Sequence, residues 1–290
     1  MKSRLLAAAL ASAALLSGCA SLDRPTGDIS YSESNSRAYN LARAGGLYQA
    51  RDRAVSADEY AVATSTVSDA FGASLALSSS HGLGLSSGGA IGLGLANALL
   101  APPGTMERSS AFFFVPAEEA ETRGEAVELV LALYLEALAG ASDALALEPY
   151  RDNPGDDPRL RFQTNGREGV GMYLINPEIG CPAREEVERF RDMCLATLQI
   201  PIRSGSPTQA PLAIGGEGQV HAFAANHKTR YPRFVLSVPD EAATLRPLLA
   251  AQISARMPEW FFAYLAPSRK HGTPPMVFEK GEPQLFIVKK

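Results

Sequence analysis

One short motif in the chain has the spacing of a hydrolase nucleophile: Gly84-Leu85-Ser86-Ser87-Gly88. The pattern G-x-S-x-G places a serine on a sharp turn between a buried strand and a helix, where a later histidine can take its proton. Ser86 would be the nucleophile, and His221, His227 or His271 the base. The motif lies in a run rich in Gly and Ser, where such matches arise by chance, so a serine hydrolase is the alternative hypothesis and not the leading one.

Two of the histidines are close enough in sequence to suggest a metal site. On one strand, His221 and His227 would point to the same face but lie about 20 Å apart, at roughly 3.3 Å per residue. A single ion could not contact both unless the strand turned. No Cys or His pair has the close spacing of a zinc site, and the chain has neither a phosphate loop nor a dinucleotide-binding motif. The sequence therefore predicts no metal and no cofactor.

The N-terminus has the features of an export signal. Lys2 and Arg4 precede an apolar run of twelve residues, from Leu5 to Leu16. A permanent membrane span needs about 20 apolar residues, so this run is typical of a cleaved secretory signal.

The end of the signal, Leu16-Ser17-Gly18-Cys19, resembles the lipobox of bacterial lipoproteins. The resemblance implies that Cys19 becomes the first residue of the mature protein, with a diacylglyceryl thioether and an N-acyl chain such as palmitate. Each buried methylene contributes about 0.8 kcal/mol, so several acyl chains anchor stably where one would not. Ala20, where inner-membrane lipoproteins carry Asp, implies the outer membrane; the resemblance leaves the side open, and the periplasmic face is favoured.

The remaining cysteines, Cys181 and Cys194, would lie in an oxidising compartment, where disulfides form. However, Pro182 followed by acidic residues is typical of a helix start, and the pattern predicts a helix over residues 183–198. Along a helix the two cysteines would lie about 20 Å apart, whereas a disulfide needs Cα atoms roughly 4.4–6.8 Å apart. Either the helix is interrupted or the disulfide does not form, and both alternatives stay open.

A long uncharged stretch separates Asp69 from Glu107, with His81 as its one titratable residue. Within residues 82–100, Gly84, Gly88 and Gly92 recur every four positions, which would allow close packing along one helix face in a membrane. This segment is similar to the glycine-zipper segments of some outer-membrane lipoproteins, including conjugative surface-exclusion lipoproteins. The similarity implies contact with the membrane or a partner. The alternative is a Gly/Ser-rich loop or a helix packed within the fold, since each helical glycine costs about 1 kcal/mol relative to alanine.

The rest of the chain alternates strand and helix patterns, so we predict an α+β fold after an N-terminal helical, Gly-rich region. The aromatic patch at Trp260–Tyr264 is interpreted as a core strand in preference to an exposed interface. We expect helices over 38–70, 116–138, 183–198 and 240–256, loops over 148–158 and 201–218, and strands over 111–115, 159–164, 170–175, 233–239, 260–265, 276–279 and 284–289.

These patterns suggest four regions. They are a signal peptide (1–18), a lipidated tether (19–37), a helical and Gly-rich region (38–106) and an α+β domain (107–290). Loss of Lys2 and Arg4 with the signal lowers the 27 basic residues to 25 against 31 acidic ones, a net charge of −6. Without clustered Lys and Arg, nucleic-acid binding is not expected.

The sequence thus favours a non-enzymatic envelope protein, anchored in the outer membrane through lipidated Cys19. We expect a structural, assembly or partner-binding role, with an envelope protein as partner, in a secretion or transfer system. The oligomeric state is left open. The alternatives are a periplasmic hydrolase that uses Ser86, and a module that binds a small ligand or glycan.

Overall fold

The computed structural model describes residues 31–65, 67, 108–163, 166–225, 232–268, 270–271 and 273–290. It contains both strands and helices, and the predicted α+β class is confirmed, with strands predominating. The strands are β1 (Arg53–Val55), β2 (Ser110–Pro116), β3 (Glu148–Pro149), β4 (Leu160–Gln163), β5 (Arg167–Ile175), β6 (Cys194–Pro201), β7 (Thr208–Gln209), β8 (Gln219–Phe223), β9 (Arg233–Ser237), β10 (Phe261–Leu265), β11 (Met276–Glu279), β12 (Glu282–Leu285) and β13 (Ile287–Lys289). The helices are α2 (Arg37–Ala44), α5 (Arg123–Ala144) and α6 (Leu245–Arg256), a further helical stretch at 57–65, and the 3₁₀ turns η1 (Pro177–Ile179), η2 (Arg184–Glu186), η3 (Phe190–Asp192), η4 (Leu212–Ile214) and η5 (Asp240–Ala242).

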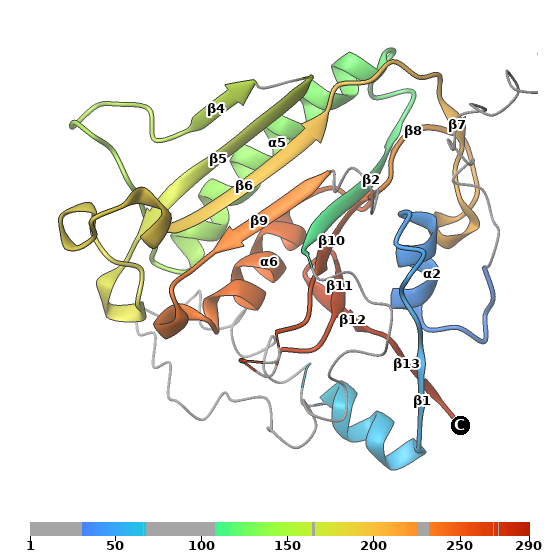
Figure 1. The fold of residues 1–290 in the computed structure, drawn as a ribbon. Helices are drawn as coiled ribbons and strands as arrows, with labels where there is room; N and C mark the ends of the chain where they lie inside the picture. The colour runs from blue at the N-terminus through green and yellow to red at the C-terminus, as the bar shows by residue number, and fades with distance from the viewer. Residues whose placement is uncertain are drawn as a thin grey trace, which may run out of the picture.

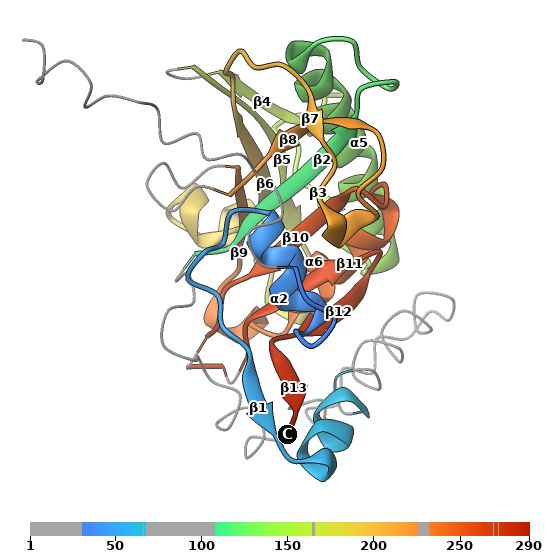
Figure 2. The ribbon, with the colours of Figure 1, turned by 90° about the vertical axis from the view of Figure 1, so that its right-hand side faces the viewer.

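An eleven-stranded antiparallel sheet forms the centre of the molecule (Figure 1). Its main order is β12-β11-β10-β2-β9-β6-β5-β3, and β4 pairs with β5. Strand β2 pairs with β10 on one side, while β8 and β9 share its other side at different positions along the strand. Beside this sheet, β1 and β13 pair in parallel near the C-terminus, side by side in both ribbon views (Figure 2).

The side chains of β2 alternate between two hydrophobic cores, as a strand requires. Ala111, Phe113 and Val115 lie in one core, which α5 and α6 cover; we call this side of the sheet the helix-covered face (Figure 1). Phe112 and Phe114 lie in the second core, beneath α2 and η4, which we call the α2 face. The aromatic patch at Trp260–Tyr264 is buried between the same elements, which confirms that it belongs to the core.

Helix α5 begins later than the sequence predicts. Pro116 is the last residue of β2, where it pairs with Val220, and does not open the helix. The helix starts instead at a capping box, in which the Thr122 hydroxyl accepts a hydrogen bond from the Glu125 N–H and the Glu125 carboxylate accepts one from the Thr122 N–H. This reciprocal arrangement satisfies two backbone donors at the helix start, which a proline and distant acids cannot do.

The helix predicted over residues 183–198 is wrong. The chain forms the turns η2 and η3 and then enters β6, which pairs with both β5 and β9. Alternate side chains of β6 are buried in the helix-covered core: Cys194, Ala196, Leu198 and Ile200. This alternation of buried residues, which is typical of a strand, outweighs the local helix signals. Because the chain turns through η2 and η3 and forms no α-helix here, Cys181 and Cys194 come within 5.3 Å (Cα–Cα), and a disulfide joins them.

Two pairs of expected strands form hairpins. Strands β4 and β5 pair in antiparallel register on either side of residues 164–166. Strands β11 and β12 are joined by Lys280 and Gly281, both with positive φ (51° and 86°), which is the backbone of a tight two-residue hairpin. The strand expected over 284–289 is divided: β12 ends at Leu285, and β13 leaves the large sheet to pair with β1.

Residues near the N-terminus pack onto the same domain. The sequence predicts a separate region over residues 38–106, yet α2 shares a core with β2 and β10, and β1 pairs with β13 (Figure 2). Gly45 ends α2 directly against the Phe112 ring, where a Cβ would lie 2.3 Å from ring carbons. Glycine is therefore needed for this close approach of helix and sheet.

Candidate binding cleft

A cleft of about 630 Å³ opens on the α2 face of the sheet. Phe114 of β2 and Phe262 of β10 lie along it, α2 contributes Arg37, and the segment 210–220 forms the opposite wall. The acidic side chains along it are Glu118, Glu217, Glu259 and Glu279, and we therefore call it the acidic cleft.

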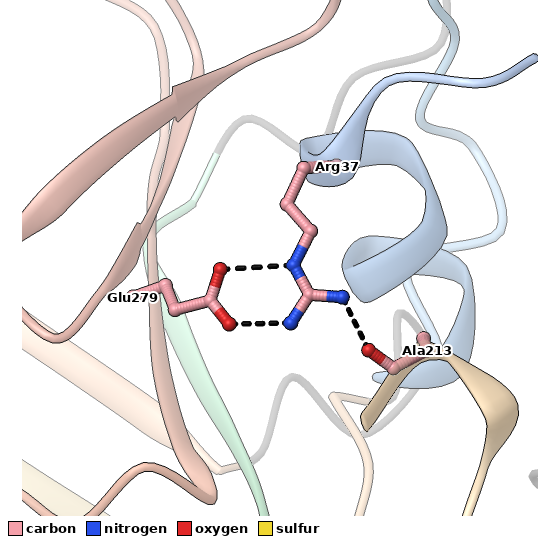
Figure 3. A network of polar contacts seen from close by, with 3 residues as sticks. All are labelled: Arg37, Ala213 and Glu279. Carbon is pink, nitrogen blue, oxygen red and sulfur yellow. Dashed lines mark hydrogen bonds and ion pairs between the residues drawn. The ribbon is translucent and has the colours of Figure 1, made fainter. Parts of the chain in front are cut away.

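Arg37 holds one wall of the acidic cleft in place (Figure 3). Its Nε donates a 2.9 Å hydrogen bond to Glu279 Oε2, and Nη2 donates to Oε1 of the same carboxylate. Its Nη1 donates to the Ala213 carbonyl oxygen in η4. The hydrogen bonds with Glu279 raise the pKa of Arg37. One guanidinium thus connects α2, β11 and η4, and a planar fork with fixed donors suits such bidentate contact.

The other three carboxylates remain open to solvent. Glu118, Glu217 and Glu259 are exposed, and none of them forms an ion pair with another described residue. Arg37 is the one cation among the described residues that line the cleft, and Glu279 already neutralises it. The cleft therefore has a local excess of about three negative charges.

Apolar groups lie beside these charges. Leu212 of η4 is 50% exposed at the cleft, and Pro116 and Ala117 are partly exposed below Glu118. Trp260 is almost buried, and its Nε1 donates a 3.1 Å hydrogen bond to Glu119 Oε1. The indole therefore fixes the segment after β2 against the start of β10. A ligand would meet carboxylates and aliphatic surface together.

The candidate catalytic and metal-binding residues do not form a site in the described part of the chain. Ser86 and His227 lie outside the described residues. His221 is buried in β8, where its Nε2 lies 3.0 Å from the Ala120 carbonyl oxygen, an arrangement typical of a core histidine. His271 pairs with Asp240 at 3.3 Å on the surface. Within the described ranges, no group of His, Cys, Asp and Glu could hold a metal ion.

The residues expected to contact the membrane also fall outside the described ranges. They are Cys19 and the Gly-rich segment 82–100. Among the helices that are described, none has the length and apolar character needed to cross a membrane.

The sequence alone does not indicate the acidic cleft. Pro116 and the acids after it have the pattern of a helix start, and residues 201–218 have that of a loop. Arg37 and Glu279 are separated by 242 residues, and no local pattern indicates that they meet. The exposed acids after a strand were the one available signal, and a helix N-terminus explains such acids equally well.

No family model matches the chain, and no match was found among curated proteins or solved structures.

Proposed function

We propose that the protein is an outer-membrane lipoprotein, tethered through acylated Cys19, that binds an envelope protein in its acidic cleft. The observation that carries the binding role is the cleft itself: about 630 Å³ of open space, where three carboxylates that form no ion pair with another described residue lie beside aliphatic groups. Unpaired charge beside accessible apolar surface is a feature of recognition sites.

The position of the cleft in the chain fits a tethered binding protein. Arg37, in the wall of the cleft, follows Cys19 by eighteen residues. Even fully extended, that segment would reach at most about 65 Å at 3.6 Å per residue. The anchor would therefore hold the cleft near the membrane, where other envelope proteins are concentrated.

Two other functions remain as alternatives. The volume of the cleft lies within the range of roughly 300–1,000 Å³ that is usual for small-ligand sites, which favours a ligand- or glycan-binding module as the second candidate. The serine hydrolase depends on Ser86. Labelling with a serine-reactive probe, with Ser86→Ala as control, tests it: labelling that depends on Ser86 would support the hydrolase.

Photocrosslinking in intact cells tests the binding role. A photoreactive residue at Leu212 lies in the cleft, whereas one at Ile202, which is 39% exposed, lies outside it. We expect a discrete protein adduct from position 212 and none from position 202. Identical adducts from both positions, or none from position 212, would contradict a partner in the cleft.

Fractionation tests the anchor. We expect Cys19→Ser to move the protein from the outer-membrane fraction to the soluble fraction and to abolish palmitate incorporation. If the Cys19→Ser protein resists extraction by carbonate, and deletion of residues 82–100 then releases it, the Gly-rich segment is a second membrane anchor. Retention in both variants would show that neither feature determines the location.

A further inference from the structure

We infer that the occupant of the acidic cleft is a cationic protein segment that carries at least two Lys or Arg side chains with apolar residues between them. This inference rests on the proposed binding function and specifies the chemistry of the partner.

The sign of the charge follows from the residues that line the cleft. Glu118, Glu217 and Glu259 are exposed and unpaired within the described part of the chain, and the one lining cation, Arg37, is bound to Glu279. An anionic ligand would meet like charge, with no free cation among the described lining residues to offset it. A cationic ligand would gain three attractive interactions, and a concave site strengthens the field that steers it inward.

The number of cations follows from the charge of the cleft and from the segments that carry it. Glu118 follows β2, and Glu259 lies in the turn that precedes β10. Glu217 comes from a third segment, the turn between η4 and β8. One cation would compensate one of the three negative charges and leave two, so at least two cations are needed to compensate most of the charge. An extended segment with cations at alternate positions, about 7 Å apart, presents them along one face.

The apolar groups favour a protein segment over a simple polyamine. Leu212 and Ala117 present aliphatic surface beside the carboxylates. Lys and Arg side chains bury their methylene stems on such surface while the charged group stays at the carboxylates, and apolar residues between them would contact Leu212. A polyamine would satisfy the charges but would leave Leu212 exposed.

The test uses the full-length protein in a non-ionic detergent and a dye-labelled peptide with alternating Lys and Leu or Phe residues. Binding is followed by fluorescence anisotropy. We expect the double variant Glu118→Gln/Glu259→Gln to bind the peptide about five- to tenfold more weakly, as expected for the loss of two exposed ion pairs. We also expect weaker binding at 500 mM than at 50 mM salt, and no binding of the same peptide with Glu in place of Lys.

The matched control is Glu185→Gln/Glu188→Gln, which removes two exposed carboxylates outside the cleft. We expect less than a twofold change for this control. The inference is overturned if both double variants lose affinity equally, if the acidic peptide binds as well as the basic one, or if spermidine binds as tightly as the peptide. Thermal melts confirm that all four Gln substitutions leave the fold intact.

The two proposals can fail separately. If position 212 forms an adduct but the cationic peptide does not bind, the partner-binding role is supported and the proposal of a cationic segment is contradicted. If position 212 forms no adduct, the proposal that the partner binds in the cleft is contradicted, whether or not the peptide binds.

Discussion

The two faces of the central sheet are closed to different extents, although β2 contributes aromatic side chains to both. On the helix-covered face, the 22-residue α5 and the 12-residue α6 close a continuous core. On the α2 face, an eight-residue helix and a single 3₁₀ turn cover the second core and leave the acidic cleft open. Apolar packing closes the first face. On the second face, Arg37 connects α2 with η4 and β11 through hydrogen bonds at the solvent-exposed surface.

This difference indicates a division of roles. The larger of the two hydrophobic cores lies on the first face. Because apolar burial stabilises a fold by about 25 cal/mol per Å², this face contributes most of the free energy that holds the domain together. The second face carries three carboxylates that form no ion pair with another described residue, and we expect its stability not to depend on them. We therefore expect substitutions on the first face to change stability and those on the second to change binding.

The largest expected effect separates the two cores. Phe113 stacks between Phe223 (4.6 Å between ring centroids) and Phe261 (5.8 Å) beneath α5 and α6. We expect Phe113→Ala to lower the free energy of unfolding by about 3–5 kcal/mol, because two long helices cannot collapse into the cavity. Phe112 is equally buried but lies under the short α2, which can move inward, so we expect Phe112→Ala to cost about 1–2 kcal/mol less. Urea denaturation of both variants checks this, and equal losses would contradict the comparison.

The second prediction concerns the disulfide, which belongs to the helix-covered core. Cys181 and Cys194 are thirteen residues apart, and the chain-entropy model gives about 3 kcal/mol for a loop of this size. We expect Cys181→Ala/Cys194→Ala to lose approximately that much stability in urea denaturation. Affinity for the cationic peptide should stay within twofold, since distant sites act independently. A large loss of affinity would show that the two faces are coupled.

The sequence predicted individual apolar strands better than the pairing between distant strands. Strands such as Ser110–Pro116 and Phe261–Leu265 are short apolar runs with their own turn signals, so their type can be predicted locally. The prediction failed at residues 183–198, because pairing of β6 with β5 and β9 overrode a local helix signal. Such pairing is decided by strands distant in sequence.

The cleft could not be predicted for a related reason. It exists because Arg37 meets Glu279 and Ala213, which lie 242 and 176 residues away. The isolated residues have no pattern of their own, and a charged pair on the surface is among the weakest determinants of a fold. The site therefore depends on contacts that only the assembled sheet creates.

The third prediction compares the starts of two helices. Thr122 caps α5 and Ser36 caps α2, each through a hydrogen bond from the backbone N–H three residues on. We expect Thr122→Ala and Ser36→Ala each to cost about 1 kcal/mol in urea denaturation. Binding should distinguish them: Ser36→Ala loosens the helix that carries Arg37 and weakens peptide binding, whereas Thr122→Ala leaves it unchanged. If both variants bind the peptide like the original chain, α2 is not a wall that the ligand requires.

The smallest expected effect is a pH dependence whose sign differs between the two faces. Asp52 accepts hydrogen bonds from the Ser36 N–H and hydroxyl beneath α2, and partial burial raises its pKa above the ordinary value. The folded state then binds the proton more tightly than the unfolded state. The contribution of Asp52 is therefore greatest below its ordinary pKa of about 3.9 and falls as the pH rises through the folded pKa.

Asp240, at the start of η5 on the other face, provides the opposite case. The ammonium group of Lys270 lowers its pKa, so its contribution is present above the ordinary pKa and is lost as the pH falls. Melting temperatures between pH 3 and 6 measure both effects against Asp52→Asn and Asp240→Asn. With rising pH, the original chain should lose stability relative to the Asp52 variant and gain it relative to the Asp240 variant. Slopes of the same sign would show that burial does not govern Asp52, and that α2 covers its face less closely than the contacts of Ser36 imply.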